Sequence, residues 1–242
     1  QQSAYQMSST LASHLSALNP LFDLQSTTGV AGSLNSLFSS FSQLTVSPNS
    51  AQSRQSVINA ASGLATAFNV ASNGLETAGN TVDTSIQSTV QDINATVADL
   101  QSLDVELRRS ASSSTPDPSL DARLHVDLET LSQYAGVTSL RQQDGSVSVF
   151  LGGQKPLLIG STQYQLQAVK TGSGTVIEDP NGVDITGAVS GGQLGALLQM
   201  RNTTLPGYQS QLDHMAQTVA TVVNNQLAAG VDQHNNPGTP LF

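Results

Sequence analysis

Hydrophobic residues between about Pro48 and Arg109 recur in steps of three and four, and this is the longest regular pattern in the chain. The mean spacing of about 3.5 residues is typical of a helix packed nearly parallel to other helices. The pattern therefore predicts one long helix around which the rest of the chain is organised. Its apolar positions are Val57, Ala61, Leu64, Phe68, Ala71, Leu75, Val82, Ile86, Val90, Ile93, Val97, Leu100, Leu103 and Leu107.

Capping residues bound this predicted helix at both ends. It begins either with Ser47 as N-cap and Pro48 at the first helical position, or with a capping box of Asn49 and Gln52. The sequence does not choose between these two starts. The helix is expected to end after the arginines at 108–109, which favour the negative end of the helix dipole, where a Ser- and Pro-rich segment follows at 110–119.

The predicted helix is longer than a compact molecule of this size is wide. At about 1.5 Å per residue it measures roughly 85–90 Å, whereas a compact chain of this length has a diameter of roughly 45 Å. We therefore expect a rod. Gly63, Gly74 and Gly79 each weaken a helix by about 1 kcal/mol relative to alanine, so residues 74–81 are the place where a kink or break would most readily interrupt the predicted helix.

Shorter helical patterns flank the long one. The first runs to Leu18 before Asn19-Pro20, and the second covers about 30–44 after a turn at 26–29 and forms an antiparallel hairpin with the long helix. A third covers 120–134, with Gly136 as its predicted C-cap, and folds back along the end of the long helix.

The hydrophobic period changes to two after residue 136. Strands are predicted at 137–140, 146–151, 156–159, 164–169 and 176–178, with turns at 143–145, 152–153, 159–161 and 171–174. The helical spacing then resumes, and Pro206 inside it indicates either a kink or a new helix. Its apolar positions are Leu194, Leu198, Leu205, Tyr208, Leu212, Met215, Val219 and Val222.

Together these patterns predict an α+β protein. We expect an elongated antiparallel helical bundle built on the one long helix, with a small antiparallel β subdomain inserted between helices. The predicted domains are a helical rod of residues 1–136 and 188–230, a β-rich subdomain of residues 137–187, and a loop of residues 231–242 leading out of the rod.

Composition narrows the classes of function. Charged residues make up 10% of the chain and the net charge is −9, so there is no basic patch for nucleic acid or for an anionic membrane surface. No apolar run is long enough to span a bilayer, and the absence of cysteine excludes thiolate chemistry and disulfides. The chain begins at Gln1 without a signal peptide, so we interpret it as a segment of a longer protein.

No set of residues has the spacing of an active site or a metal centre. The four histidines are scattered, so ordinary surface or interface roles are expected for His14, His125, His214 and His234. A solvated turn is a better interpretation of Asp232, Asn235 and Asn236 than a calcium loop. Gly191-Gly192-Gln193 is interpreted as the first turn of a helix, because no Lys-Ser/Thr pair follows it. We therefore predict no catalytic, cofactor-binding or metal-binding residue, no cofactor, and no enzymatic activity.

Motifs distributed over nearly the whole chain resemble the bacterial flagellar hook-associated protein 1 (FlgK) family. Their order and spacing, more than any single motif, make the resemblance specific. The motifs are Leu34, Phe38, Phe41, Leu44 and Pro48; Arg54 and Gln55 with Leu64, Phe68 and Asn69; the strand unit 144–161; Gly191 to Arg201 with Leu205, Pro206, Tyr208, Leu212 and Asp213; and Val223, Asn224, Asn225, Gly230, Asp232 and 238–242.

The sequence departs from the family pattern at three points. Leu124 follows Asp121 and Arg123 where the family commonly has a second aspartate, and Leu227 replaces a histidine that is usual near the end of the last helix. The terminal segments that form the inner coiled coil of the family are absent from both ends, which puts assembly by this chain alone in doubt.

The resemblance implies a structural role as a junction protein between the flagellar hook and filament. It implies as partners other copies in a ring, the hook protein, a second hook-associated junction protein, and an export chaperone bound through the absent C-terminus. It also implies an extracellular location reached by flagellar type III export, and a role in flagellum assembly and motility. The alternative is an extracellular adhesin or binding module that presents the β domain on a helical stalk, although only Tyr164 and Phe150 offer aromatic contacts there.

Overall fold

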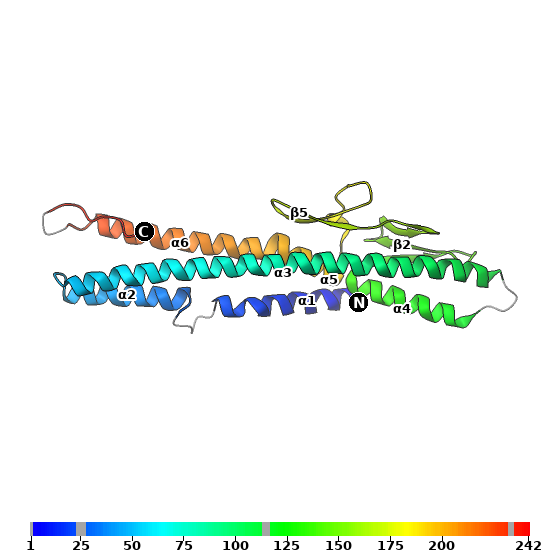
Figure 1. Ribbon diagram of the computed structural model, residues 1–242, viewed down its shortest axis with the longest axis horizontal. Helices are drawn as coiled ribbons and strands as arrows, with labels where there is room; N and C mark the ends of the chain where they lie inside the picture. The colour runs from blue at the N-terminus through cyan, green and yellow to red at the C-terminus, as the bar shows by residue number, and fades with distance from the viewer. Residues whose placement is uncertain (1, 23–27, 113–116, 232–234) are drawn as a thin grey trace. The chain divides into compact units, whose positions relative to one another are not determined.

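The structure is a computed structural model that describes residues 2–22, 28–112, 117–231 and 235–242 (Figure 1). Its helices are α1 (Gln2–Leu18), α2 (Val30–Val46), α3 (Ala51–Ala111), α4 (Pro118–Tyr134), α5 (Gly192–Gln199) and α6 (Leu205–Ala228). Its strands are β1 (Val137–Arg141), β2 (Val147–Leu151), β3 (Lys155–Ile159), β4 (Thr162–Gln163), β5 (Gln167–Thr171) and β6 (Gly174–Glu178). The predicted α+β class, with one long helix and a small antiparallel β region between helices, is confirmed.

The long helix α3 contains 61 residues and is continuous through residues 74–81, so the break that the sequence left open there does not occur. Gly74 is needed for packing against Leu21. A Cβ placed at this position would lie 2.4 Å from a methyl carbon of Leu21. The glycine makes room for that leucine. Burial of neighbours such as Ala71 and Leu75, each 3% exposed, outweighs a helix-propensity cost of about 1 kcal/mol.

The start of α3 also differs from both predicted starts. The helix begins at Ala51, and the hydroxyl of Ser50 accepts a hydrogen bond from the backbone N–H of Ser53 at 3.2 Å. Ser47 is instead the C-cap of α2, and its carbonyl accepts from the N–H of Ser50 at 3.1 Å. A connection this short leaves Ser50 as the first side chain able to cap α3.

The predicted apolar seam of α3 is confirmed almost residue for residue. Of its predicted members, Phe68 is half-buried and all the others are buried. Leu64, Ile86, Ile93, Leu100 and Leu103 are at most 1% exposed. The seam is the main hydrophobic contribution of α3 to both of the compact units into which the chain divides.

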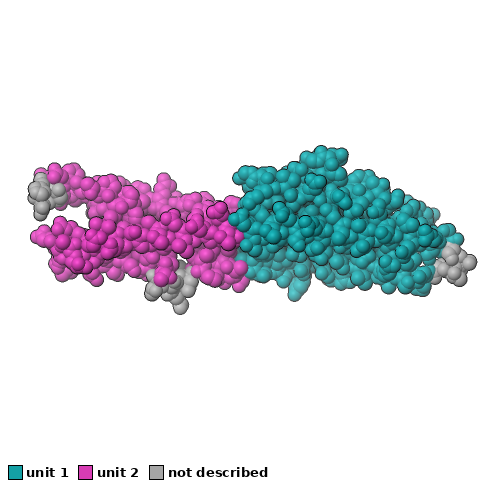
Figure 2. Space-filling view, viewed as in Figure 1, with its two compact units in different colours: residues 1–15, 79–204 teal, residues 16–78, 205–242 magenta. Residues whose placement is uncertain are grey.

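These two compact units are formed by residues 1–15 with 79–204, and by residues 16–78 with 205–242 (Figure 2). We call them unit 1 and unit 2. They group segments by spatial contact, and each contains part of α3. The boundaries predicted for a helical rod and a β subdomain remain a prediction, as does the rod shape.

Unit 2 is built on the predicted hairpin of α2 and α3. Its apolar cluster consists of Leu37, Val57, Ala61 and Leu64, against which residues from α2, α3 and α6 pack. The predicted seam of α6 is wrong at two positions, since Met215 is 39% and Val222 is 62% exposed. Val223, which is 9% exposed, faces the interior, so the buried stripe of α6 is displaced by one residue at this end.

Unit 1 combines α4 with two antiparallel sheets, and Figure 1 shows α4 and the strands on different sides of α3. One sheet has the order β1-β2-β3-β4, and the other is the hairpin β5-β6. The strand predicted at 164–169 is wrong in its bounds, because residues 164–166 lie between β4 and β5. The chain there is held by side chains of α3, as described below.

Two helix ends in unit 1 also correct the sequence analysis. Ala135, with extended backbone, caps α4, so Gly136 is not the C-cap. A Cβ on Gly136 would lie 1.8 Å from the carbonyl oxygen of Ser190, and this close approach is the reason for the glycine. At Pro206, α5 continues through a π-helical turn at Met200–Thr204 into α6, which begins at Leu205, one residue before the predicted alternative start.

We expect Ile93→Asp to destabilise the protein by about 3–5 kcal/mol, because Ile93 is fully buried and a carboxylate there would have no partner. Denaturant unfolding followed by circular dichroism measures the change. Val105→Asp is the matched control on the same helix, since Val105 is 42% exposed. Equal losses for the two variants would contradict burial of the seam.

Candidate functional site

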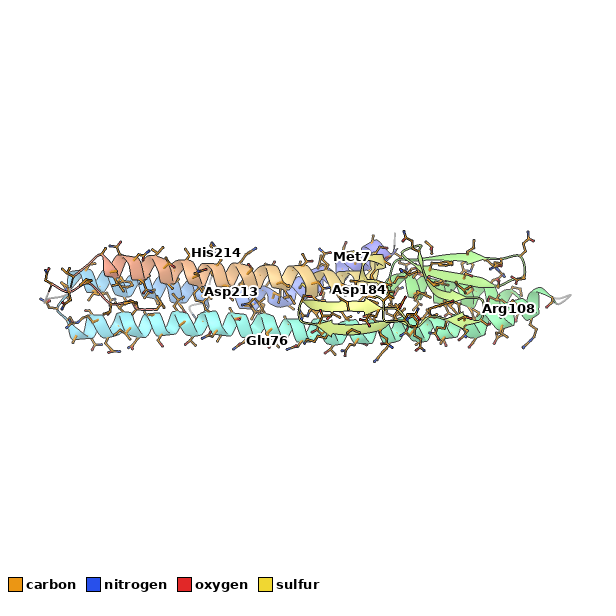
Figure 3. The ribbon with its side chains drawn as sticks, turned by 90° about the horizontal axis from the view of Figure 1, so that it is seen from above. Met7, Glu76, Arg108, Asp184, Asp213 and His214 are labelled. Atoms are coloured by element: carbon orange, nitrogen blue, oxygen red, sulfur yellow. The ribbon has the colours of Figure 1, made fainter. Side chains whose placement is uncertain are left out.

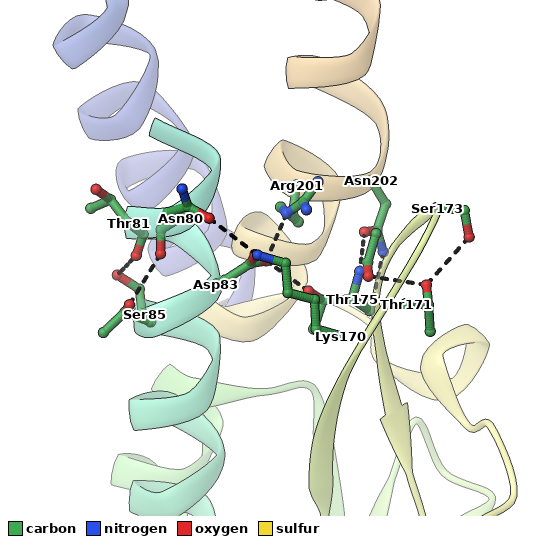
Figure 4. Close-up of polar contacts among 12 residues, drawn as sticks. Asn80, Thr81, Asp83, Ser85, Lys170, Thr171, Ser173, Thr175, Arg201 and Asn202 are labelled. Atoms are coloured by element: carbon green, nitrogen blue, oxygen red, sulfur yellow. Dashed lines mark hydrogen bonds and ion pairs between the residues drawn. The ribbon is translucent and has the colours of Figure 1, made fainter. Parts of the chain in front are cut away.

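A polar cluster of unit 1 surrounds Asp83, a residue of α3 that lies beside the apolar seam (Figure 4). Its Oδ1 atom accepts hydrogen bonds from Arg201 Nε at 2.6 Å and from Thr175 Oγ1 at 2.7 Å. Its Oδ2 atom forms an ion pair with Lys170 Nζ at 3.0 Å. One buried carboxylate therefore joins α3 to β5, to β6 and to the π-helical turn.

The environment of Asp83 favours its ionised form. Burial acts to raise the pKa of this carboxyl, but hydrogen bonds from Thr175, Arg201 and Lys170 together outweigh burial and lower the pKa below its ordinary value. Removal of this one charge would leave two cations facing each other. The cluster thus stabilises the attachment of the β5-β6 hairpin to α3 only while Asp83 is charged.

The π-helical turn makes a second attachment with the residue after Arg201. Asn202 Oδ1 accepts from the backbone N–H of Thr175 at 2.9 Å, and Asn202 Nδ2 donates to the carbonyl of Thr175 at 2.8 Å. A Cβ at Gly174 would lie 2.2 Å from Asn202 Oδ1, so only glycine allows this approach. Asn202 therefore holds the backbone of β6 directly, whereas Arg201 is linked to the Thr175 side chain through Asp83.

The chain between β4 and β5 is attached to α3 in the same manner. Asn94 Oδ1 accepts from the N–H of Leu166 at 2.9 Å, and Asn94 Nδ2 donates to the carbonyl of Leu166 at 2.8 Å. Gln163 Nε2 donates to the carbonyl of Asn94 at 2.7 Å, and Gln101 Nε2 donates to the carbonyl of Ser161 at 2.6 Å. The Asn94 contact takes the place of the predicted strand pairing at Leu166, whereas the N–H of Tyr164 still donates to the carbonyl of Leu157 in β3 at 2.9 Å.

A third attachment holds the start of β2. Asp104 of α3 is fully buried, and its Oδ1 accepts from the N–H of Val147 at 2.7 Å. Its Oδ2 pairs with Arg108 one helical turn later at 2.8 Å. The arginine supplies the opposite charge that a buried carboxylate requires.

The residues that the sequence analysis considered for chemistry do not come together in the described part of the chain. His125 and His214 are exposed, and His14 is half-buried with a pKa lowered by burial. Figure 3 shows His214 beside Asp213 on α6 and Asp184 in the β region. His234 and Asp232 lie outside the described residues, as do parts of the predicted turn at 26–29 and of the Ser-rich segment at 110–119.

The interpretation of Gly191-Gly192-Gln193 as a helix start is confirmed. Gly191 is the N-cap of α5, and both glycines have positive φ, at 73° and 66°. A Cβ at Gly192 would lie 2.5 Å from the backbone of Tyr134 and Ala135, so the pair allows α5 to pass close to the end of α4. The glycines serve packing within unit 1.

The polar contacts of Asp83, Asn94 and Asp104 attach the strands and loops of unit 1 to α3. Within the described residues, no three His, Cys, Asp or Glu side chains form a group able to hold a metal ion, and no described helix is long and apolar enough to cross a membrane. Asp83 and Asp104 were not predicted as functional residues. Each directly follows an apolar seam position, but exposed Asp92 also adjoins the seam, so the local pattern did not distinguish them.

The fold and the polar cluster define a class of protein in which a long helix is the scaffold and buried polar side chains fix a small β region to it. The sequence model of the flagellar hook-associated protein FlgK helical domain matches residues 15–242. The chain therefore belongs to the FlgK helical domain family of flagellar hook-associated proteins, as its motifs indicated.

Individual relatives agree with the family. The chain is 27% identical over 224 residues to flagellar hook-associated protein 1 of Salmonella typhimurium, covering 88% of this chain and 40% of the relative. It is 25% identical over 228 residues to the protein of that name from Escherichia coli K12, covering 90% of this chain and 42% of the relative. The solved structure of the flagellar hook junction protein FlgK from Burkholderia pseudomallei matches with a TM-score of 0.80 and 30% identity, over 99% of this chain and 46% of that one. This chain thus spans less than half the length of these relatives.

We expect Asp83→Asn to lower the free energy of unfolding at pH 7 by about 2–3 kcal/mol, because charge-assisted hydrogen bonds are lost and two cations remain. Asp83 has a lowered pKa in the folded state, so its contribution is present above the ordinary value of 3.8 and is lost as the pH falls through the folded pKa. The difference between wild type and variant should therefore shrink towards pH 3.

Urea unfolding at pH 7 and at several lower values measures this difference. Asp92→Asn is the control, because Asp92 is an exposed acid on the same helix. A loss that is independent of pH, or equal in the control, would show that the cluster does not act through the charge of Asp83.

Proposed function

We propose that this chain is the outer core of a structural protein that connects the flagellar hook to the filament. The observation that supports this proposal is the match of the FlgK helical domain over residues 15–242, joined to a structural likeness that covers 99% of the chain. The relatives are named as hook-associated or hook junction proteins. The alternative of an adhesin has no support from these relatives.

The internal attachments of unit 1 agree with a mechanical role. The side chains of Asp83, Asn94 and Asp104 form hydrogen bonds with neighbouring elements of the same unit. These bonds stabilise the attachment of the β region to α3. Such groups are engaged in structure and are not directed at a substrate. We infer that the chain acts by its shape and rigidity and not by catalysis.

The proposed partners are other copies in a ring, the hook protein, and a second hook-associated junction protein. An export chaperone bound by a C-terminal segment is a further proposed partner. The proposed location is outside the cell, after passage through the flagellar type III export apparatus. These partners and this route come from the family resemblance and are proposals for the whole protein.

Immunogold electron microscopy tests the proposed location. Antibodies raised against this chain should label isolated flagella at the point where hook meets filament, and a strain that lacks the gene is the control. Labelling spread over the cell surface, with none on flagella, would support the adhesin alternative and overturn the proposal.

We expect this chain alone to be monomeric at micromolar concentration, with addition to hook ends confined to the full-length protein. The chain has a net charge of −9, so like-charged copies repel mildly. Sedimentation velocity measures the state of association. A stable closed oligomer of this chain would show that the outer region carries assembly by itself.

A further inference from the structure

The chain contains two Asn-Gly pairs, and the structure places them in opposite environments. Asn73-Gly74 lies inside the continuous helix α3, where the neighbouring Ala71 and Leu75 are each 3% exposed. Asn181-Gly182 lies in an exposed turn between β6 and the short 3-10 helix η2 (Thr186–Ala188). Asparagine followed by glycine is a reactive context for deamidation, because glycine has no Cβ to hinder attack by its own backbone nitrogen. The two pairs share this chemistry and differ in how the fold holds them.

The reaction needs only the chain and water. The backbone nitrogen of the glycine attacks Cγ of the asparagine side chain and closes a five-membered succinimide. The side-chain amide leaves as ammonia and carries away the proton of the glycine N–H. Water then opens the succinimide at either carbonyl and yields aspartate or isoaspartate, each with one more negative charge than asparagine. In isoaspartate the main chain runs through the side-chain carbons and is longer by one methylene group.

Hydrogen bonds local to the turn hold Asn181 and Gly182. The N–H of Gly182, which must lose its proton for the attack, donates to the carbonyl of Asp179 at 2.9 Å. The Oδ1 atom of Asp179 accepts from the N–H of Asn181 at 2.9 Å and from the N–H of Val183 at 3.1 Å. The residues at 180–184 are exposed, so opening of the turn at Gly182 uncovers no buried side chain.

The helical pair is protected by the packing of α3. Freeing the N–H of Gly74 requires a turn of the helix to open, and this opening would uncover the buried seam residues Ala71 and Leu75. Local opening at an exposed turn takes less free energy than opening of a packed helix. The attacking nitrogen is therefore released far more often at Gly182 than at Gly74.

We propose that Asn181 is a site of spontaneous deamidation, and that its isoaspartate form loosens the loop that closes one edge of β6. This is the edge that faces away from β5. There the N–H of Ile177 donates to Thr186 Oγ1 at 2.8 Å, and the carbonyl of Ile177 accepts from the N–H of Ile185 at 2.8 Å. The proposal is independent of the hook–filament function.

The turn at Asn181 sets where this loop returns to β6. The chain comes back through Asp184, which forms an antiparallel bridge with Glu178. An added methylene after Asn181 separates the N–H groups of Asn181 and Val183, which share one oxygen of Asp179. The new carboxylate also joins the acids already present in the loop, and like charges repel. Both effects weaken the contacts that bring the loop to β6.

Peptide mapping by mass spectrometry tests the site in the whole chain. The folded chain and the chain in guanidinium chloride are incubated in parallel at one mildly alkaline pH, and the exchange of NH for O is followed at both Asn-Gly pairs. In the folded chain, Asn181 should react within about tenfold of its rate in the denatured chain, whereas Asn73 should be slowed at least about a hundredfold.

Asn181→Gln is the matched control, because glutamine closes the larger ring far more slowly. This variant should lose the signal at position 181 and keep the slow reaction at Asn73. Protection of Asn181 in the folded chain as strong as that of Asn73 would overturn the site.

Amide hydrogen exchange followed by NMR tests the loosened loop after the isoaspartate form has been separated by chromatography. Exchange at Ile177 and Ile185 should accelerate about tenfold, since about one net hydrogen bond is weakened. Exchange at Leu64 in unit 2 should be unchanged. Asn181→Asp adds the charge without the methylene and should accelerate exchange at these two amides by less.

Three results would overturn the effect on β6. One is unchanged exchange at Ile177 in the isoaspartate form. Another is equal acceleration in Asn181→Asp, which would remove the lengthened main chain from the explanation. The third is acceleration at Leu64 as well, because a general loss of stability would then replace a local change in the loop.

Discussion

The apolar seam of α3 is the constraint on which the rest of the structure depends. Its buried residues run from Val57 to Leu107 within one unbroken helix, and every part of that stripe must be covered by another segment. In unit 2 the cover comes from α2, α6 and Leu241. In unit 1 much of the surrounding chain is β-strand or irregular, so covering the stripe brings backbone polar groups close to an apolar surface.

Polar side chains of α3 beside the seam solve this difficulty. Asn94 and Asp104 bind the backbone of Leu166 and Val147, and Asp83 binds the side chains that fix β5 and β6. Each places a donor or an acceptor where a loop or strand end lacks a partner of its own. The helix therefore supplies both the hydrophobic surface and the polar groups that satisfy whatever covers it.

Features with a strong periodic signal were predictable from the sequence. The seam of α3, the α2-α3 hairpin and the turns at Gly145 and Gly152 follow from local spacing and from residues that favour positive φ. Whether the helix breaks near Gly74 could not be decided from the sequence, because the partner that requires that glycine, Leu21, lies far away in sequence. The polar cluster was missed for the same reason, since Asp83 acquires its meaning from Lys170, Thr175 and Arg201, which only the fold brings to it.

Three asparagines, Asn94, Asn202 and Asn224, each bind both an N–H and a carbonyl of the main chain and do not recognise the side chains of the segments that they hold. Such contacts do not depend on the side chain of the bound residue itself. A neighbouring position can still be restricted, as Gly174 is by the close approach of Asn202. A shape fixed through backbone atoms can persist while the sequence changes, and the chain keeps a TM-score of 0.80 to a solved relative at 30% identity.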